Sequence, residues 1–85
     1  MSIEEIRQLL LAQFPGSVVN VSGEDAHFSV DIISPEFANQ SRFNRQKKVL
    51  SCVKDRITSG EIHAFSVQAF TEEEWSRNGE SLTVL

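Results

Sequence analysis

The sequence contains a single cysteine, Cys52, among its 85 residues. One thiol excludes an internal disulfide and any zinc site that needs two thiolates from this chain. Long hydrophobic runs are also missing: the longest run near the N-terminus covers residues 9–12, whereas a membrane span needs ~20 apolar residues. Because Glu4 and Glu5 precede that run in place of basic residues, we expect no signal peptide, no membrane association and a cytoplasmic protein.

Glycine is also scarce, with four residues in the chain. None of them builds a Gly-x-x-Gly loop, the element with which one class of RNA-binding domain clamps a nucleic-acid backbone. A Gly-x-Ser-x-Gly nucleophile elbow and a glycine-rich phosphate-binding loop are absent as well. The two histidines, His27 and His63, lack an obvious pairing with carboxylates. We therefore expect a protein without enzymatic activity.

The charge is acidic overall and basic in one segment. The formal net charge of −4 argues against broad binding to nucleic acid. Six of the eight lysines and arginines nevertheless lie between positions 42 and 56, and they are Arg42, Arg45, Lys47, Lys48, Lys54 and Arg56. A local basic face on an acidic protein can bind an acidic protein partner or a phosphate backbone. It can equally be the solvated side of a helix, and both interpretations stay open.

Capping and periodicity predict a helix and then two strands in the first part of the chain. Residues 2–5 form a capping box, and apolar residues at helical spacing continue from there to about Phe14. The β-branched segment 17–21 predicts a first strand, and the polar segment 22–26 predicts a turn. In residues 27–32 apolar and polar residues alternate, which predicts a second strand that forms a hairpin with the first.

The second part of the chain predicts a short helical turn, a long helix, a strand and a last helix. Ser34 and Ser41 are the expected caps of the two helical segments, and Gly60 is expected to end the second. A strand is expected at residues 62–70, followed by a capping box at 71–74 that opens the last helix. The long helix is expected to bury one face, formed by Phe43, Gln46, Val49, Leu50, Val53 and Ile57.

The chain is therefore predicted to be one α+β domain over residues 1–85, with a loose tail from residue 79. Helices packed on one face of a three-stranded sheet would bury the apolar residues of the second and third strands. Trp75 is expected to pack the last helix against the sheet. Cys52, in the middle of the long helix, is expected to be an inert core residue.

Four segments resemble the motifs of the BolA family, in that family's order. His27-Phe28 resembles a His-Phe pair that opens the second strand, and residues 37–49 resemble a signature in which a Phe and a Ser-Arg pair precede a basic helix. Residues 62–66, Ile-His-Ala-Phe-Ser, resemble a C-terminal strand with its hallmark histidine, and residues 71–75 resemble the Thr-x-x-Glu-Trp that follows. The short loop at 21–25 resembles the YrbA/IbaG-type branch. The resemblance covers nearly the whole chain and implies a BolA-like fold, a class II KH-like variant of order α-β-β-α-α-β-α with a mixed sheet.

The same resemblance implies a function. Members typically partner a monothiol glutaredoxin, and the two chains share a [2Fe–2S] cluster in iron–sulfur cluster trafficking or iron sensing. A glutaredoxin cysteine and a glutathione thiol hold one side of that cluster, and the BolA-type chain supplies the remaining ligands, of which the strand histidine is constant. In this chain that histidine is His63. We expect the cluster only in the complex, and the isolated chain to be a monomer or a weak homodimer.

Some members are described as transcriptional regulators that bind DNA through the basic helix. The resemblance therefore implies an alternative function, DNA binding, and the surface residues for it would be Arg42, Arg45, Lys47, Lys48 and Lys54. These residues are not interleaved with exposed aromatics that could stack on bases. The acidic net charge also points away from this alternative.

The histidines are the expected metal ligands, with His63 the stronger candidate. Alternation along residues 62–70 would place His63 on the core side, where a lone histidine is usually a buried residue bonded to a backbone carbonyl. Its position at the start of the strand, together with the resemblance, favours a ligand. A regular second strand would place His27 on the opposite, polar face, and two ligands of one metal must converge on it at about 2 Å. The two histidines would converge only if the start of the second strand were frayed. Otherwise Asp25, or a water or thiol from the partner, would replace His27 as the second ligand.

Overall fold

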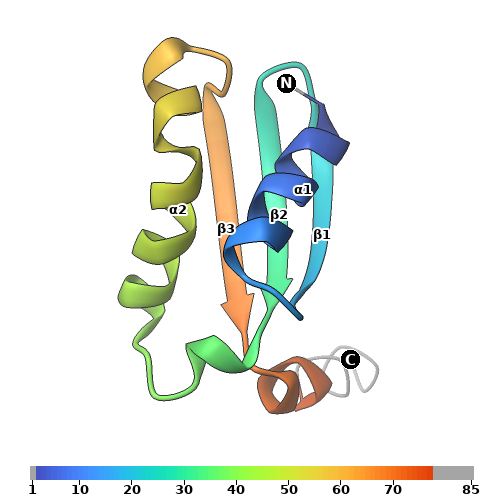
Figure 1. The fold of residues 1–85 in the computed structure, drawn as a ribbon, viewed down its shortest axis with the longest axis vertical. Helices are drawn as coiled ribbons and strands as arrows, with labels where there is room; N and C mark the ends of the chain where they lie inside the picture. Colours follow the sequence, from blue (N-terminus) through green and yellow to red (C-terminus); the bar gives the residue numbers. More distant parts are fainter. Residues whose placement is uncertain (1, 78–85) are drawn as a thin grey trace.

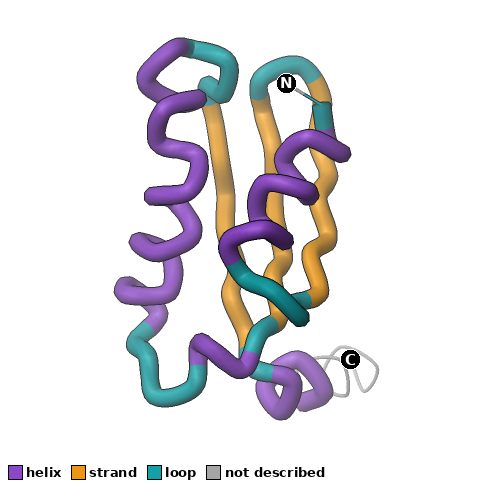
Figure 2. The backbone as a smooth tube through the Cα atoms, viewed as in Figure 1, coloured by secondary structure: helices purple, strands orange, loops and turns teal. Residues whose placement is uncertain are grey.

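The computed structural model describes residues 2–77. In chain order its elements are helix α1 (Ile3–Gln13), strands β1 (Val18–Glu24) and β2 (His27–Ile33), the 3₁₀ turn η1 (Pro35–Phe37), helix α2 (Arg42–Ser59) and strand β3 (Ala64–Phe70). Residues 72–77 form a further helical segment. Helices α1 and α2 lie on one face of the sheet (Figure 1), and Figure 2 shows where loops separate the elements. The α+β class and the order of the elements are confirmed, while the predicted tail from residue 79 lies outside the described residues.

The strands form a mixed sheet in the order β1-β2-β3. β1 and β2 pair antiparallel as a hairpin, and β2 and β3 pair parallel. The register places His27 between Glu24 of β1 and Ala64 of β3. No helix within residues 2–77 has the length and apolar composition to cross a membrane.

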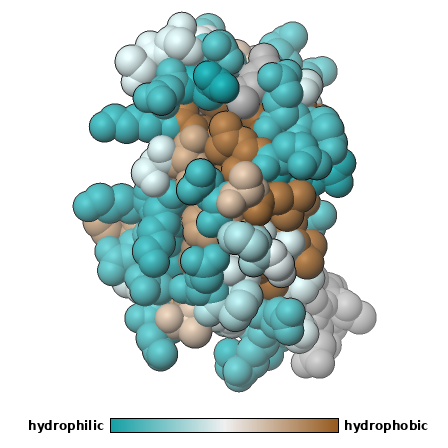
Figure 3. Space-filling model, viewed as in Figure 1, coloured by the Kyte–Doolittle hydropathy of each residue, from teal (hydrophilic) through white to brown (hydrophobic). Residues whose placement is uncertain are grey.

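The core lies between the sheet and the two helices. Because side chains alternate along a strand, every second residue of β2 faces the helices, and Phe28, Val30 and Ile32 are buried. The fully buried residues that the helices contribute are Ile6, Leu10, Val49 and Val53. Figure 3 shows hydrophobic side chains gathered in the middle of this face, with hydrophilic side chains around them.

The predicted caps are present at the helix ends. Ser2 and Glu5 form the reciprocal capping box of α1. The Ser41 hydroxyl accepts a hydrogen bond from a backbone N–H in the first turn of α2. Gly60 ends that helix with a φ of 86°, a left-handed conformation that favours glycine. These local signals therefore set the helix boundaries.

The first strand is longer than predicted. β1 continues to Glu24, so the predicted turn is present but consists of Asp25 and Ala26 alone, and its predicted extent over residues 22–26 is wrong. Asp25 has a φ of 58°, as tight two-residue hairpin turns require. Gly23 remains in the strand with a φ of 130°, and a Cβ there would overlap the backbone of the facing strand. Hairpin pairing, more than side-chain polarity, sets the length of this strand.

The buried face of α2 is narrower than predicted. Val49 and Val53 are fully buried, whereas Phe43, Leu50 and Ile57 are exposed. The prediction that no exposed aromatic lies among the basic residues is therefore wrong, because the Phe43 ring, between Arg42 and Arg45, is 72% exposed. The helix contacts the outer strand β3 and helix α1, so it lies over one edge of the sheet. One flank of α2 therefore extends beyond the sheet and is partly open to solvent. Helical periodicity alone could not separate this flank from the buried face.

The helical segment 72–77 packs against the end of β3. The Trp75 ring lies edge-on to the Phe70 ring, with 5.2 Å between ring centroids. The indole is 40% exposed, so it covers the end of the sheet without being enclosed. The prediction that Trp75 packs the last helix against the sheet is confirmed.

Candidate functional site

His27 and His63 lie next to each other at one end of the sheet. The ring centroids are 6.4 Å apart and the ring planes meet at 66°. Both side chains are exposed. His27 is the first residue of β2, and His63 directly precedes β3. Two residues far apart in the sequence are thus brought together by the parallel pairing of β2 with β3.

The backbone around Ala26 explains this arrangement. The Ala26 carbonyl accepts hydrogen bonds from the N–H of His63 at 2.7 Å and from the N–H of Ala64 at 3.1 Å. One acceptor shared by two successive donors interrupts the regular strand pattern before β3. Ile62 fills the core position, with 1% of its surface exposed, and His63 points to solvent.

Two predictions about the histidines are corrected by this geometry. The strand begins at Ala64, not at residue 62, so alternation does not place His63 on the core side. β2 is regular from its first residue, one of the two alternatives left open by the sequence, and His27 lies on the open face with Ser29. Because His63 is outside the strand, a regular β2 does not separate the two rings, and no frayed strand start is needed.

Neither imidazole is held by a hydrogen bond or an ion pair from the described residues. The position of a Cβ built on Gly60 would be 3.9 Å from Nε2 of His63, so that ring lies in ordinary van der Waals distance of the end of α2. Among residues 2–77 no hydrogen bond or ion pair uses either imidazole. The ring nitrogens are therefore accessible to a ligand from solvent or from a partner.

The described residues supply this pair and no larger cluster. Within residues 2–77 no group of three or more His, Cys, Asp or Glu side chains could hold a metal ion. Asp25 therefore does not complete a three-ligand site with the histidines. Cys52 lies in the middle of α2, half-buried, with its Sγ 3.5 Å from the Lys48 carbonyl. Burial raises the pKa of the Cys52 thiol, which favours the unreactive protonated form.

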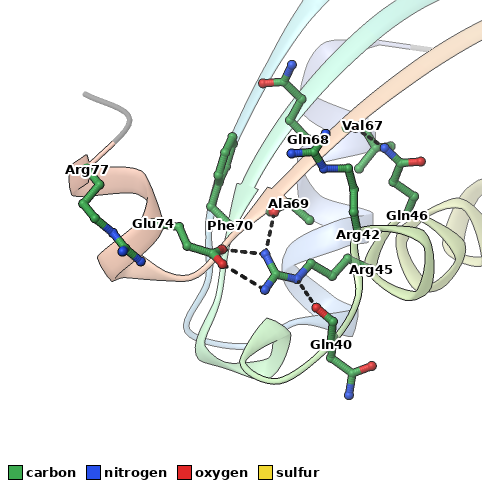
Figure 4. A pocket seen from close by; sticks show the side chains of 10 residues that line it. All are labelled: Gln40, Arg42, Arg45, Gln46, Val67, Gln68, Ala69, Phe70, Glu74 and Arg77. Atoms are coloured by element: carbon green, nitrogen blue, oxygen red, sulfur yellow. Dashed lines mark hydrogen bonds and ion pairs between the residues drawn. The ribbon is translucent and has the colours of Figure 1, made fainter. Parts of the chain in front are cut away.

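The structure places Arg45 differently from the other basic residues proposed as a surface. Its side chain is 12% exposed and lies in a groove of about 830 Å³ between the start of α2 and the end of β3 (Figure 4). The guanidinium donates to the backbone carbonyls of Gln40 and Ala69 and pairs with both carboxylate oxygens of Glu74, at 2.5 and 3.1 Å. Arg45 therefore joins three segments of the fold. The other four residues, Arg42, Lys47, Lys48 and Lys54, are exposed.

Glu74 is held from two sides. Besides the ion pair, its carboxylate accepts a hydrogen bond from the Thr71 N–H at 2.9 Å, and the Thr71 hydroxyl accepts from the Glu74 N–H. The Arg45 guanidinium, followed by the Thr71 N–H, lowers the pKa of the Glu74 carboxyl from 4.5 to about 2. The capping box predicts the bond to Thr71, but no local pattern identifies Arg45, which lies 29 residues earlier.

The chain is similar to known proteins over most of its length. Residues 12–74 match the family model of BolA-like proteins. The acid stress protein IbaG of Escherichia coli strain K12 is 33% identical over 78 residues, which are 92% of this chain and 93% of IbaG. A protein of the rpoN-murA intergenic region of Acinetobacter guillouiae is 35% identical over 77 residues, 91% of this chain and 93% of that protein.

Solved structures show the same similarity. A BolA homologue from Coxiella burnetii has a TM-score of 0.78 at 25% identity, and the match covers 89% of this chain and 97% of that one. Yeast Fra2 has a TM-score of 0.66 at 30% identity, with 89% and 85% covered.

Proposed function

Because this chain belongs to the BolA family, in its YrbA/IbaG-type branch, we propose that it binds a monothiol glutaredoxin and completes a shared [2Fe–2S] cluster. The proposed role is non-enzymatic, in iron–sulfur cluster trafficking or iron sensing. The observation that carries the proposal is the exposed pair His27 and His63, with ring centroids 6.4 Å apart. The glutaredoxin link itself comes from the family resemblance.

The histidine pair fits such a group. Two imidazoles that bind one metal through nitrogen atoms at about 2 Å have ring centres about 5 Å apart. The observed 6.4 Å is close to that value, and exposed side chains can change rotamer without moving the core. The backbones are already fixed relative to each other, because both lie beside the shared Ala26 carbonyl. His63 is the first ligand of the proposal and His27 the second.

Imidazole ligands from this chain would change the reduction potential of the proposed cluster. A neutral imidazole in place of a thiolate raises the reduction potential of a bound iron–sulfur cluster. In the proposal the remaining ligands, a cysteine and a glutathione thiol, come from the partner side. This chain then presents two neutral nitrogen ligands on a fixed backbone and contributes no reacting group.

The test compares visible absorption and circular dichroism spectra of this chain co-purified with a monothiol glutaredoxin. We expect a cluster spectrum that differs from that of the glutaredoxin alone, and that reverts to it in His63→Ala. His27→Ala is expected to alter the spectrum, while Ser29→Ala, on the same open face of β2, leaves it unchanged. A spectrum that His63→Ala does not alter would show that the site is assigned wrongly.

DNA binding through α2 is the second candidate function. Four exposed cations, Arg42, Lys47, Lys48 and Lys54, support it. If they contact phosphates, affinity for duplex DNA falls steeply with salt, and Lys48→Ala lowers the salt dependence. Absence of measurable binding at low salt would end this candidate. Because Arg45 is tied to Glu74, we assign it no phosphate contact.

The cellular setting is also proposed from the relatives. IbaG of Escherichia coli is described as an acid stress protein. We propose that this chain likewise acts in a stress response, in the cytoplasm. Growth of a deletion strain at low pH, with and without the His63→Ala gene, tests both the role and its dependence on the site.

A further inference from the structure

Helix α2 carries an exposed apolar line that the core does not use. Phe43, Leu50 and Ile57 are 72%, 36% and 40% exposed. They recur every seven residues, about two turns of helix, and so lie along one face. They account for half of the large hydrophobic residues exposed among residues 2–77; the other three are Ile3, Val18 and Trp75. Clustering of this kind, unlike scattered single residues, indicates an interaction surface.

Two lysines lie between the apolar residues. Lys47 and Lys54 alternate with Phe43, Leu50 and Ile57 at steps of three and four residues, which is the spacing of one helix face. We call these five residues the α2 ridge. Both lysines are exposed, and no ion pair within the described residues includes them. Their methylene stems extend the apolar line, while the ammonium groups remain at its border.

The chemistry of the α2 ridge identifies its partner. Apolar residues seven apart occupy one of the two seam positions of a helix–helix contact, and the lysines four residues further along occupy a flanking position. Lysines interleaved with them select acidic groups on the facing helix. We propose that the α2 ridge is a docking surface for an acidic amphipathic helix of a partner protein, with apolar residues against Phe43, Leu50 and Ile57. The proposal rests on α2 alone and is independent of the histidine pair.

Other occupants fit less well. A second copy docked antiparallel about Leu50 would bring Lys47 and Lys54 of the two chains together, and like charges in an interface are unfavourable. A DNA phosphate backbone would pair with the lysines but leave the three apolar side chains in water. A membrane surface suits helices with a broad apolar face. The other apolar face of α2, with Val49 and Val53, is already in the core.

The experiment uses the full chain, isotopically labelled for NMR, and a synthetic helix. The probe is a peptide of about three heptads with leucine at the seam positions and glutamate beside them. A second peptide with lysine in place of glutamate is its charge control. We expect the acidic peptide to shift resonances of the α2 ridge and to leave His27 and His63 unchanged. The lysine peptide is expected not to bind.

Variants of this chain sharpen the test. Leu50→Ala and the double change Lys47→Glu with Lys54→Glu are each expected to weaken peptide binding at least about fivefold. The first removes the central apolar contact, and the second puts like charges opposite each other at the border. Ser51→Ala, exposed on α2 beside Leu50 but off the ridge, is expected to bind as the unchanged chain does. If Leu50→Ala lost its folded circular dichroism spectrum, the surface lysine variant would still decide the question.

Several results would overturn the proposal. One is the absence of ridge shifts with the acidic peptide, and another is equal binding of both peptides. Ridge shifts produced by phosphatidylserine vesicles, by duplex DNA or by raised protein concentration, without any by the acidic peptide, would assign the surface to a membrane, to DNA or to a second copy.

Discussion

Replacing Glu74 by glutamine should destabilise the fold in a manner that depends on pH. The Arg45 guanidinium and the Thr71 N–H lower the Glu74 pKa from 4.5 to about 2, so folding favours the charged carboxylate. A difference of that size corresponds to about 3 kcal/mol at 1.36 kcal/mol per pKa unit. Because the Glu74 side chain is 34% exposed, solvent screening reduces our expectation to about 1–2 kcal/mol. Glutamine keeps the shape of the side chain and removes the charge.

The sign of the pH dependence follows from the lowered pKa. The contribution is complete above about pH 4.5, where the carboxylate is charged in the folded and unfolded states. It is lost as the pH falls towards about 2, where the carboxyl is protonated in both. The difference in unfolding free energy between the unchanged chain and Glu74→Gln should therefore shrink through this range. Glu4 and Glu5, whose pKa values are also lowered, are present in both proteins and cancel.

Urea unfolding followed by circular dichroism, at several pH values, measures this difference. Glu73→Gln is the matched control, because Glu73 pairs with Arg77 at 3.4 Å on a side chain that is 80% exposed. We expect that control to cost less than about 0.5 kcal/mol at any pH. A Glu74→Gln protein as stable as the unchanged chain near neutral pH, or a difference that does not change with pH, would refute the assigned role of this ion pair.

Two further changes test the packing. Gly23→Ala should destabilise the fold by roughly 1–3 kcal/mol, because alanine disfavours a φ of 130° and its Cβ would overlap the facing strand. Urea unfolding measures the loss, and a neutral effect would contradict the register of the hairpin. Val53→Ala should lower the unfolding free energy by about 2 kcal/mol and Ile57→Ala by less than about 1 kcal/mol, because only Val53 is buried. Equal losses of stability in thermal unfolding would show that α2 packs with a wider face than described.

Local signals in the sequence were enough to predict most of the fold. Ser2, Ser41 and Gly60 mark helix ends because caps act within one turn of the backbone that they satisfy. The alternation in β2 is clear because one face of that strand is core and the other is open. The end of β1 could not be predicted in this way. Its last residues are polar on both faces, and pairing with β2 keeps them in the strand.

The width of the buried face of α2 was beyond prediction for a different reason. Phe43 and Val49 have similar apolar character, and both fit helical spacing with the rest of the predicted face. Which of them is buried depends on where the helix lies over the sheet. Because α2 covers the edge strand β3, the predicted apolar face is divided into a buried part and an exposed part. Only the position of α2 over the sheet reveals that the exposed part is available to a partner.

The candidate metal site shows the same limit of local reasoning. His27 and His63 were each identified from the sequence, but their proximity depends on one carbonyl, that of Ala26, accepting from both His63 and Ala64. This contact shifts the start of β3 and turns His63 out of the core, while Ile62 fills the core position. Backbone hydrogen bonds position the pair, and no described side chain bonds to either imidazole. The ring nitrogens therefore make no contact that the fold depends on. The two ring centroids lie 6.4 Å apart with the nitrogens unbonded among the described residues, which is the arrangement that the proposed shared ligand requires.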